Sequence, residues 1–146
     1  MNDADLIEQF ESCTLPFDQW THRAHVKVAW IYLNRHGFEE ALARLRRGIM
    51  AYNAANKVPE GTLMGYNETT THALLHLIEA VRRAYAATHP AADADSFYEM
   101  HPQLHSKHAL RFFYSPQRRI VPEAKAQFIE PDLAPLPRFL DPEVQD

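Results

Sequence analysis

The sequence contains a single cysteine, Cys13, and no long run of apolar residues. One cysteine excludes a disulfide within the chain and any cysteine-rich metal site. The longest apolar stretch, from Val26 to Leu33, is interrupted by Lys27 and is far shorter than the roughly 20 residues that cross a bilayer. The N-terminal residues lack the basic start and apolar centre of a signal peptide. We therefore expect no membrane partner and a cytoplasmic location.

The sequence also has no excess of positive charge: its formal net charge is −4. A chain of this sign has no overall attraction to phosphate backbones, so we expect no nucleic-acid partner. Neighbouring arginines such as Arg118 and Arg119 are predicted to lie on solvated helix faces. The sequence also lacks a nucleophile motif, a phosphate-binding loop and a cofactor signature.

What is present is typical of one globular domain. Hydrophobic residues make up 46% of the 146 residues and charged residues 23%, which are ordinary proportions for a chain of this size. No run of alternating residues is long enough for a sheet. We therefore predict an all-α domain over residues 1–146, with a compact bundle of five to six helices over 1–130 and an extended, proline-rich tail over 131–146 packed on it.

Helix signals divide the chain. Apolar spacing and capping residues predict four helices: one from about Asp3, one from His22 to His36 between Thr21 and Gly37, one from Phe38 to about Asn53, and one from Asn67 to about Thr88. Leu74, Leu77, Ile78, Val81 and Tyr85 should face the core in the last of these. Shorter elements are predicted after Asp95, Pro102, Ser115 and Pro122.

Four prolines between Pro131 and Pro142 forbid a helix in the tail. Apolar tail residues need cover, so we expect four of them to be buried: Leu133, Leu136, Phe139 and Leu140.

Histidine is the unusual residue, with nine copies in the chain, and four of them fall in two notable clusters. His22 and His25 are three residues apart at the start of one predicted helix, so they share a face. Glu68, His72 and His76 recur every four residues in another and also share a face.

Short connections favour antiparallel neighbours, so the helices that carry these clusters should run parallel. Their N-termini would then lie at the same end of the bundle, together with Tyr52 and Asn53 from the end of the third helix. We expect one pocket to hold both clusters.

Such a pocket suits several kinds of chemistry. A divalent metal (zinc, iron or manganese) would be held by four ligands, His22, His25, Glu68 and His72. Without metal, Glu68 and His25 would act as acid and base, with burial raising the pKa of Glu68. Substrate would be bound by Tyr52, Asn53, Tyr66 and Asn67, and the helix N-termini would favour an anionic group.

Simpler interpretations stand beside these. A histidine near a helix start is often only hydrogen-bonded, Glu68 can serve the helix dipole, and threonines 69–71 can bond back to the backbone. His101, His105 and His108 have helical spacing as well, but Pro102 interrupts them.

Several motifs resemble a family of small, helical bacterial proteins that has no assigned reaction. The resemblance runs from about Phe10 to Pro137 and rests on five segments: Trp20 to His25, Ala51 to Asn53, Gly65 to Thr69, Tyr114 to Pro116 and Glu130 to Asp132. The position of Asn67 in that family is more often a histidine. The resemblance therefore implies that this chain lacks one potential ligand and that Asn67 serves as a cap or polar contact.

Two functional hypotheses follow. The first is a small-molecule-binding helical protein, with a metal-dependent enzyme as its more specific form, whose pocket lies at one end of the bundle. The alternative is a non-catalytic interaction or scaffold protein in which the polar cluster is structural and the tail contacts a partner. A concave cavity beside the histidines favours the first hypothesis, and solid packing around them favours the second.

Overall fold

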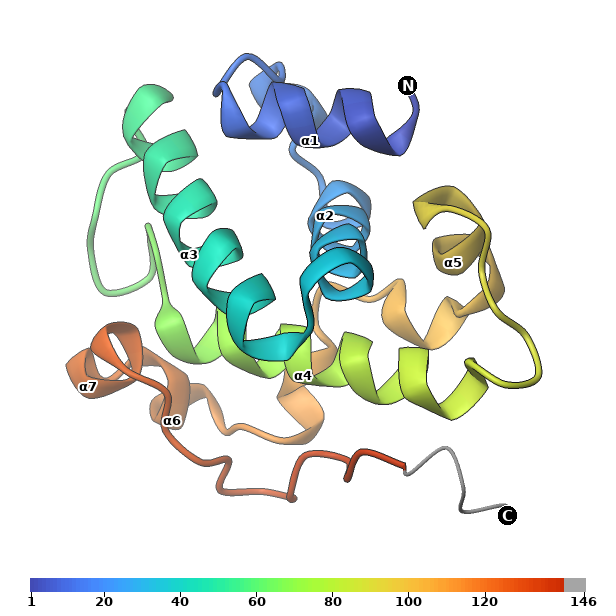
Figure 1. The fold of residues 1–146 in the computed structure, drawn as a ribbon. Helices are drawn as coiled ribbons and strands as arrows, with labels where there is room; N and C mark the ends of the chain where they lie inside the picture. Colours follow the sequence, from blue (N-terminus) through green and yellow to red (C-terminus); the bar gives the residue numbers. More distant parts are fainter. Residues whose placement is uncertain (141–146) are drawn as a thin grey trace.

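The computed structural model describes residues 1–140, and its regular secondary structure over this range is all helical (Figure 1). The helices and 3₁₀ turns (η) are α1 (Asp3–Glu11), η1 (Phe17–Gln19), α2 (His22–His36), α3 (Phe38–Ala55), α4 (Glu68–Tyr85), α5 (Ala94–Met100), η2 (Pro102–Leu104), η3 (Ala109–Phe112), α6 (Pro116–Ile120) and α7 (Pro122–Ala126). The predicted all-α class is confirmed. Two of the seven helices, α6 and α7, are only five residues long.

The three long helices begin where the sequence predicts. The Thr21 side chain accepts a hydrogen bond from the backbone N–H of Ala24 at 3.2 Å, and the Asn67 side chain accepts one from Thr70 at 2.9 Å. Such caps satisfy backbone donors that a helix leaves unpaired in its first turn. Gly37, at φ +82°, separates α2 from α3 in a conformation that other residues rarely adopt. Local capping chemistry therefore sets these boundaries.

Two predictions for the C-terminal half are wrong in detail. Asp93, not Asp95, caps α5, because its carboxylate accepts from the backbone N–H of Ser96 at 2.8 Å. Asp95 instead forms ion pairs with Arg23 and Lys27 on α2. Pro102 opens only a single 3₁₀ turn. Side chains in this segment hydrogen-bond to backbone carbonyls that a longer helix would use. For example, His105 Nε2 donates to the carbonyl of Tyr98 at 2.7 Å.

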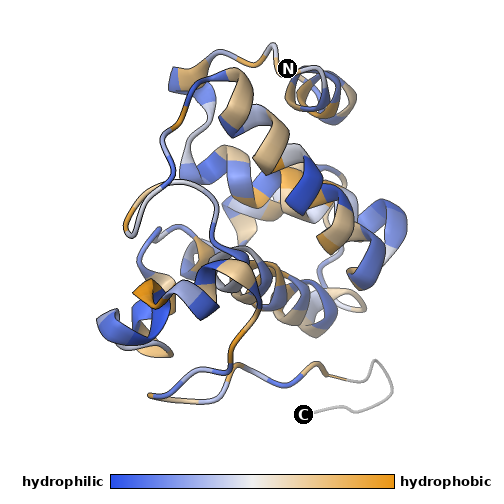
Figure 2. Cartoon of the chain, turned by 90° about the vertical axis from the view of Figure 1, so that its left-hand side faces the viewer, coloured by the Kyte–Doolittle hydropathy of each residue, from blue (hydrophilic) through white to orange (hydrophobic). Residues whose placement is uncertain are grey.

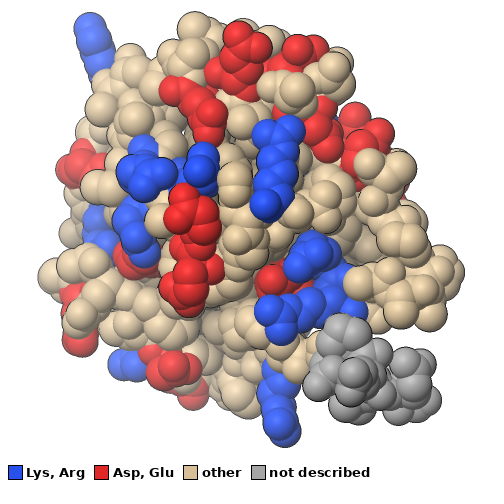
Figure 3. All heavy atoms as spheres, viewed as in Figure 1, with Lys and Arg blue, Asp and Glu red and all other residues tan. Residues whose placement is uncertain are grey.

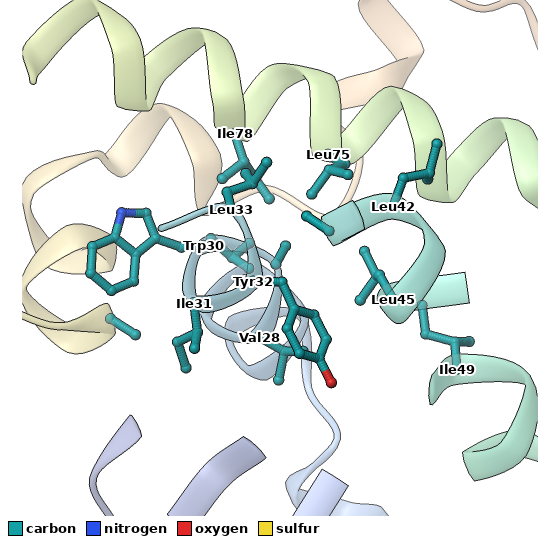
Figure 4. Close-up of a cluster of buried hydrophobic side chains, with 14 of the residues drawn as sticks. Val28, Trp30, Ile31, Tyr32, Leu33, Leu42, Leu45, Ile49, Leu75 and Ile78 are labelled. Carbon is teal, nitrogen blue, oxygen red and sulfur yellow. The ribbon is translucent and has the colours of Figure 1, made fainter. Parts of the chain in front are cut away.

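α2 is the central helix of the fold. Its residues from Val28 to Leu33 are all buried, because α1, α3, α4 and α5 pack around it. Figure 4 shows α2 nearly end-on, with Leu75 and Ile78 approaching from α4 and Leu42 and Leu45 from α3. A helix that is apolar around most of its surface needs neighbours on every side.

The direction of α2 relative to α4 differs from the prediction. In Figures 1 and 4, α2 points along the line of sight whereas α4 lies across the picture. The predicted parallel arrangement of α2 and α4 is therefore wrong. An antiparallel bundle leaves one face of each helix exposed, whereas crossing helices can cover α2 all round.

The burial of α4 does not follow one stripe. Its predicted core residues are unequal: Leu77 and Ile78 are buried, Leu74 and Val81 are partly buried and Tyr85 is exposed. Leu75, outside the predicted stripe, is fully buried. α4 packs against α2 and α3 and also against α7 and η3, so it is covered on more than one face.

The tail runs extended beside α4, on the opposite side of the molecule from α1 (Figures 1 and 2). Leu136, Phe139 and Leu140 are partly buried as the tail crosses the helices. The expected burial of Leu133 is wrong, because this side chain is 58% exposed while its backbone N–H bonds to the carbonyl of Phe113 at 2.9 Å. The part of the predicted tail from 141 to 146 lies outside the described residues.

Acidic and basic side chains are mixed over most of the face shown in Figure 3. Acidic side chains gather over α1, at the upper edge of Figure 3, where Asp3 and Asp5 lie in the first turn and the last turn has no basic residue. Among the described helices, none has both the length and the apolar character needed to cross a membrane.

Candidate functional site

A pocket of about 280 Å³ lies where α2, α3 and the start of α4 meet. We call it the aromatic pocket. Its wall comes from five parts of the chain: Phe17 and Trp20 before α2, His25 on α2, Leu45, Ile49 and Asn53 on α3, Val58 and Gly65 in the following loop, and Tyr66, Asn67, Thr70, Thr71 and Leu74 around the N-terminus of α4.

Four of the residues predicted for the site line this pocket together. They are His25, Asn53, Tyr66 and Asn67. Although α2 and α4 cross, residues near the start of both helices line this pocket, and both helices pack against α3. The structure thus places part of each histidine-containing motif on one wall.

Stacked rings form one side of the pocket. Trp20 lies between Phe10 and His25, with ring centroids 4.7 Å and 3.8 Å away. Tyr52 is fully buried beneath this stack, 5.4 Å from Trp20, and its hydroxyl donates to the carbonyl of Leu15 at 2.6 Å. Tyr52 therefore supports the pocket from below and does not line it.

His25 is held in one tautomer. Its Nδ1 lies 2.7 Å from the carbonyl oxygen of Thr21, and because a carbonyl only accepts, Nδ1 carries the hydrogen. Nε2 is then an acceptor, and no described residue donates to it. Burial lowers the pKa of His25 to about 4, so the ring is neutral at pH 7.

Other polar groups complete the wall. Asn67 is committed twice, since its oxygen caps α4 and its Nδ2 donates to the carbonyl of Arg119 at 3.0 Å. Within residues 1–140, by contrast, the Asn53 amide and the Thr70 hydroxyl form no side-chain hydrogen bond. His25, Asn53 and Thr70 thus bring one acceptor and two groups that both donate and accept to the pocket. The predicted site set omitted Trp20 and Thr70, although both lie within the motifs that drew attention to the region.

Glu68 lies outside the aromatic pocket. Arg46 donates to both of its carboxylate oxygens, at 2.8 Å and 2.7 Å, and the Tyr66 hydroxyl donates at 2.7 Å. Burial alone would raise the pKa of Glu68, but the bonds from Arg46 and Tyr66 outweigh it and hold the pKa below its ordinary value. The expectation of a raised pKa is therefore wrong, and Glu68 is an ionised structural partner of Arg46.

The predicted metal ligands are dispersed. His22 Nε2 donates to the carbonyl of Leu104 at 2.8 Å, and His72 stacks on Phe128 with a centroid distance of 4.0 Å. Within residues 1–140, no three His, Cys, Asp or Glu side chains are placed to hold a metal ion. The structure thus does not assemble His22, His25, Glu68 and His72 into one ligand set. The predicted ligands are separated for two reasons. α2 and α4 cross, and Arg46 holds the Glu68 carboxylate through two hydrogen bonds.

Comparison with known proteins adds no further assignment. The chain matches no family model, no curated protein sequence and no solved structure.

Proposed function

We propose that this protein binds a small, flat organic molecule in the aromatic pocket, with His25 as the main polar contact. The observation that carries the proposal is the Nε2 atom of His25, an acceptor without a described partner on the wall of a cavity. A polar atom that faces a cavity without a protein partner can accept a hydrogen bond from a ligand, and a few such groups are what fix a ligand in a mostly apolar pocket.

The shape and lining of the pocket support this class of ligand. Ligand sites are concave and mostly apolar, with a few convergent polar groups. The volume of about 280 Å³ is just below the roughly 300–1,000 Å³ usual for such sites, which favours a molecule of about one ring. The rings of Phe17, Trp20 and Tyr66 line the pocket, and this aromatic wall favours an aromatic ligand.

The charge state of His25 limits which ligands can bind. An imidazole with a pKa of about 4 is not protonated at pH 7, so it accepts a hydrogen bond and does not pair with an anion. We therefore expect a heteroaromatic ring that carries an N–H or O–H donor.

NMR can test this directly, because the chain has two tryptophans. A library of single-ring heteroaromatic compounds with N–H or O–H donors is added to ¹⁵N-labelled protein. Binding should shift the indole N–H signal of Trp20. The signal of Trp30, which is buried against Phe97 at 5.6 Å, should stay in place and serves as an internal control.

Matched variants identify the contact. His25→Phe keeps a ring on Trp20 but removes Nε2, so affinity should fall about five- to tenfold, the value of one neutral hydrogen bond. His22→Gln alters the neighbouring histidine, which does not line the pocket, and should leave affinity within about twofold. Equal affinity in His25→Phe, or no compound that shifts Trp20, would contradict the proposal.

The alternative, an interaction protein, has one observation in its favour. Phe112 is 79% exposed beside an apolar groove of about 540 Å³ that includes Val81 and Leu104. Exposed apolar surface of this kind is common at protein contacts. Light scattering of the wild type and of Phe112→Ser over a range of concentrations tests for self-association through this surface.

A further inference from the structure

A second and larger pocket adjoins the aromatic pocket. We call it the basic pocket; its volume is about 650 Å³, and it shares Gly65, Asn67 and Thr70 with the first. Three cationic side chains line it, Arg111 from η3, Arg119 from α6 and Lys125 from α7, and no acidic residue does.

The two arginines lack carboxylate partners. Lys125 is engaged, since its ammonium donates to the carbonyls of Gly61 and Met64 and lies 3.4 Å from Glu60. Arg111 and Arg119, however, form no ion pair with any residue in the range 1–140. Most other arginines in the fold, such as Arg23, Arg46 and Arg82, do pair with acids. The basic pocket therefore concentrates uncompensated positive charge.

Of the two arginines, Arg119 has the stronger need for a hydrogen-bond partner. Its Nε atom is buried and, within the described part of the chain, has no hydrogen-bond partner. Burial and the neighbouring charge of Arg111 lower the pKa of Arg119. The side chain as a whole is only partly buried, but a buried N–H without a hydrogen-bond partner destabilises the folded state. The fold keeps this group in place through its backbone, because the carbonyl of Arg119 accepts from Asn67.

From this juxtaposition we infer that Arg111 and Arg119 form a binding site for an oxyanion, a phosphate or carboxylate group of a small molecule. The planar guanidinium presents parallel N–H donors that match the paired oxygens of either group. The N-terminus of α4, from which Asn67 and Thr70 line the pocket, adds positive potential from the helix dipole.

The inference also revises the prediction that Arg118 and Arg119 lie on a solvated face. Arg118 donates to the carbonyl of Glu130 at 2.8 Å, whereas Arg119 turns into the pocket wall. The anion site does not rest on the proposed function, because Arg111 and Arg119 do not line the aromatic pocket and anion binding can be measured without a ligand in that pocket.

The test uses inorganic phosphate and acetate as probes, with sodium chloride at equal ionic strength to account for screening. The side-chain Nε–H signal of Arg119 is followed by NMR. We expect a saturable shift with phosphate or acetate, and none with chloride. The relative affinities of the two probes show which oxyanion the site prefers. Absence of a saturable shift with both would overturn the inference.

Variants supply an independent measurement by calorimetry or thermal shift. Arg119→Gln should weaken binding roughly tenfold or more, because it removes a charge-assisted bond in a partly buried site. Arg111→Gln, at an exposed position, should weaken it roughly two- to fivefold. Arg47→Gln is the control, since Arg47 is exposed on α3 and outside this pocket; it changes net charge equally and should stay within twofold.

Stability separates loss of binding from loss of folding. Phosphate should raise the melting temperature of the wild type but not that of Arg119→Gln. Without phosphate, Arg119→Gln should melt at the same or a higher temperature, because the buried Nε–H that lacks a partner is gone. If Arg47→Gln loses as much affinity as Arg119→Gln, the binding is unspecific and the assigned site is wrong.

Discussion

Arg46 and Glu68 join the middle of α3 to the first residue of α4 through two parallel hydrogen bonds, from Nε at 2.8 Å and from the terminal nitrogen at 2.7 Å. The Glu68 side chain is almost fully buried, whereas that of Arg46 is 40% exposed. Tyr66, which lines the aromatic pocket, donates to the same carboxylate. The pair therefore links the two helices and holds the hydroxyl of one pocket residue.

Breaking this pair should be costly. Glu68→Gln leaves Arg46 and the Tyr66 hydroxyl facing a neutral amide in a partly buried site. Loss of one partner of a buried pair costs about 3–5 kcal/mol, and the partial exposure of Arg46 reduces this to about 2–3 kcal/mol. Urea unfolding measures the free energy of unfolding. Glu40→Gln removes a similar but exposed pair with Arg44 and should cost less than about 1 kcal/mol; equal losses would show that the Arg46–Glu68 pair has no special role.

A close contact under the pocket gives a second prediction. A Cβ atom added to Gly48 on α3 would overlap the ring of Phe10, with the Cζ atom 2.6 Å away. Phe10 is fully buried against Trp20 and cannot move aside freely. Gly48→Ala should therefore destabilise the fold by about 1–3 kcal/mol, although alanine favours a helix by about 1 kcal/mol. Gly61→Ala, with no atom near its Cβ, should not destabilise it, and urea unfolding compares the two.

The sequence predicts the elements of this fold better than their arrangement. The boundaries of α2, α3 and α4 follow from Thr21, Gly37 and Asn67, because caps are local interactions between residues a few positions apart. The crossing of α2 by its neighbours depends on contacts between distant segments, and helical periodicity carries no information on that angle.

The same division holds for the candidate site. The sequence predicts one pocket with His25, Asn53, Tyr66 and Asn67, and these four residues do line one pocket, but the prediction rests on a parallel arrangement of α2 and α4 that the structure does not have. The roles of Glu68 and Arg119 were not predictable, since one depends on Arg46, 22 residues away, and the other on the absence of a carboxylate nearby in space. Charge partners across helices are properties of the tertiary structure.

Acid should destabilise the protein through His25. Its pKa is about 4 in the folded state, below the ordinary value of 6.5, so the unfolded chain binds the proton first as the pH falls. Stability should therefore decrease between pH 6.5 and 4, by up to about 3 kcal/mol.

His25→Phe removes this contribution, and its free energy of unfolding should depend less on pH over that window than that of the wild type. Burial also lowers the pKa of His72 and of His101, so both proteins keep part of the slope. Chemical denaturation at a series of pH values gives the comparison, and an NMR titration of His25 should show a midpoint near 4. Identical slopes in the two proteins would contradict the assignment.

The tail should behave as part of the fold. His76 Nε2 donates to the carbonyl of Pro137 at 2.6 Å, and the ring of Phe139 stacks on His76 at 4.3 Å and beneath the guanidinium of Arg83 at 4.5 Å. Ending the chain after Glu130 removes all of these contacts. It should lower the melting temperature by at least about 5 °C, because about 1 kcal/mol shifts a domain of this size by a few degrees. Phe139→Ala should account for about 1–2 kcal/mol, whereas Leu133→Ala, at an exposed side chain, should have little effect. If both substitutions leave the melting temperature unchanged and protease removes the tail from the intact protein without loss of stability, the tail is an attached segment whose contacts with α4 do not stabilise the domain.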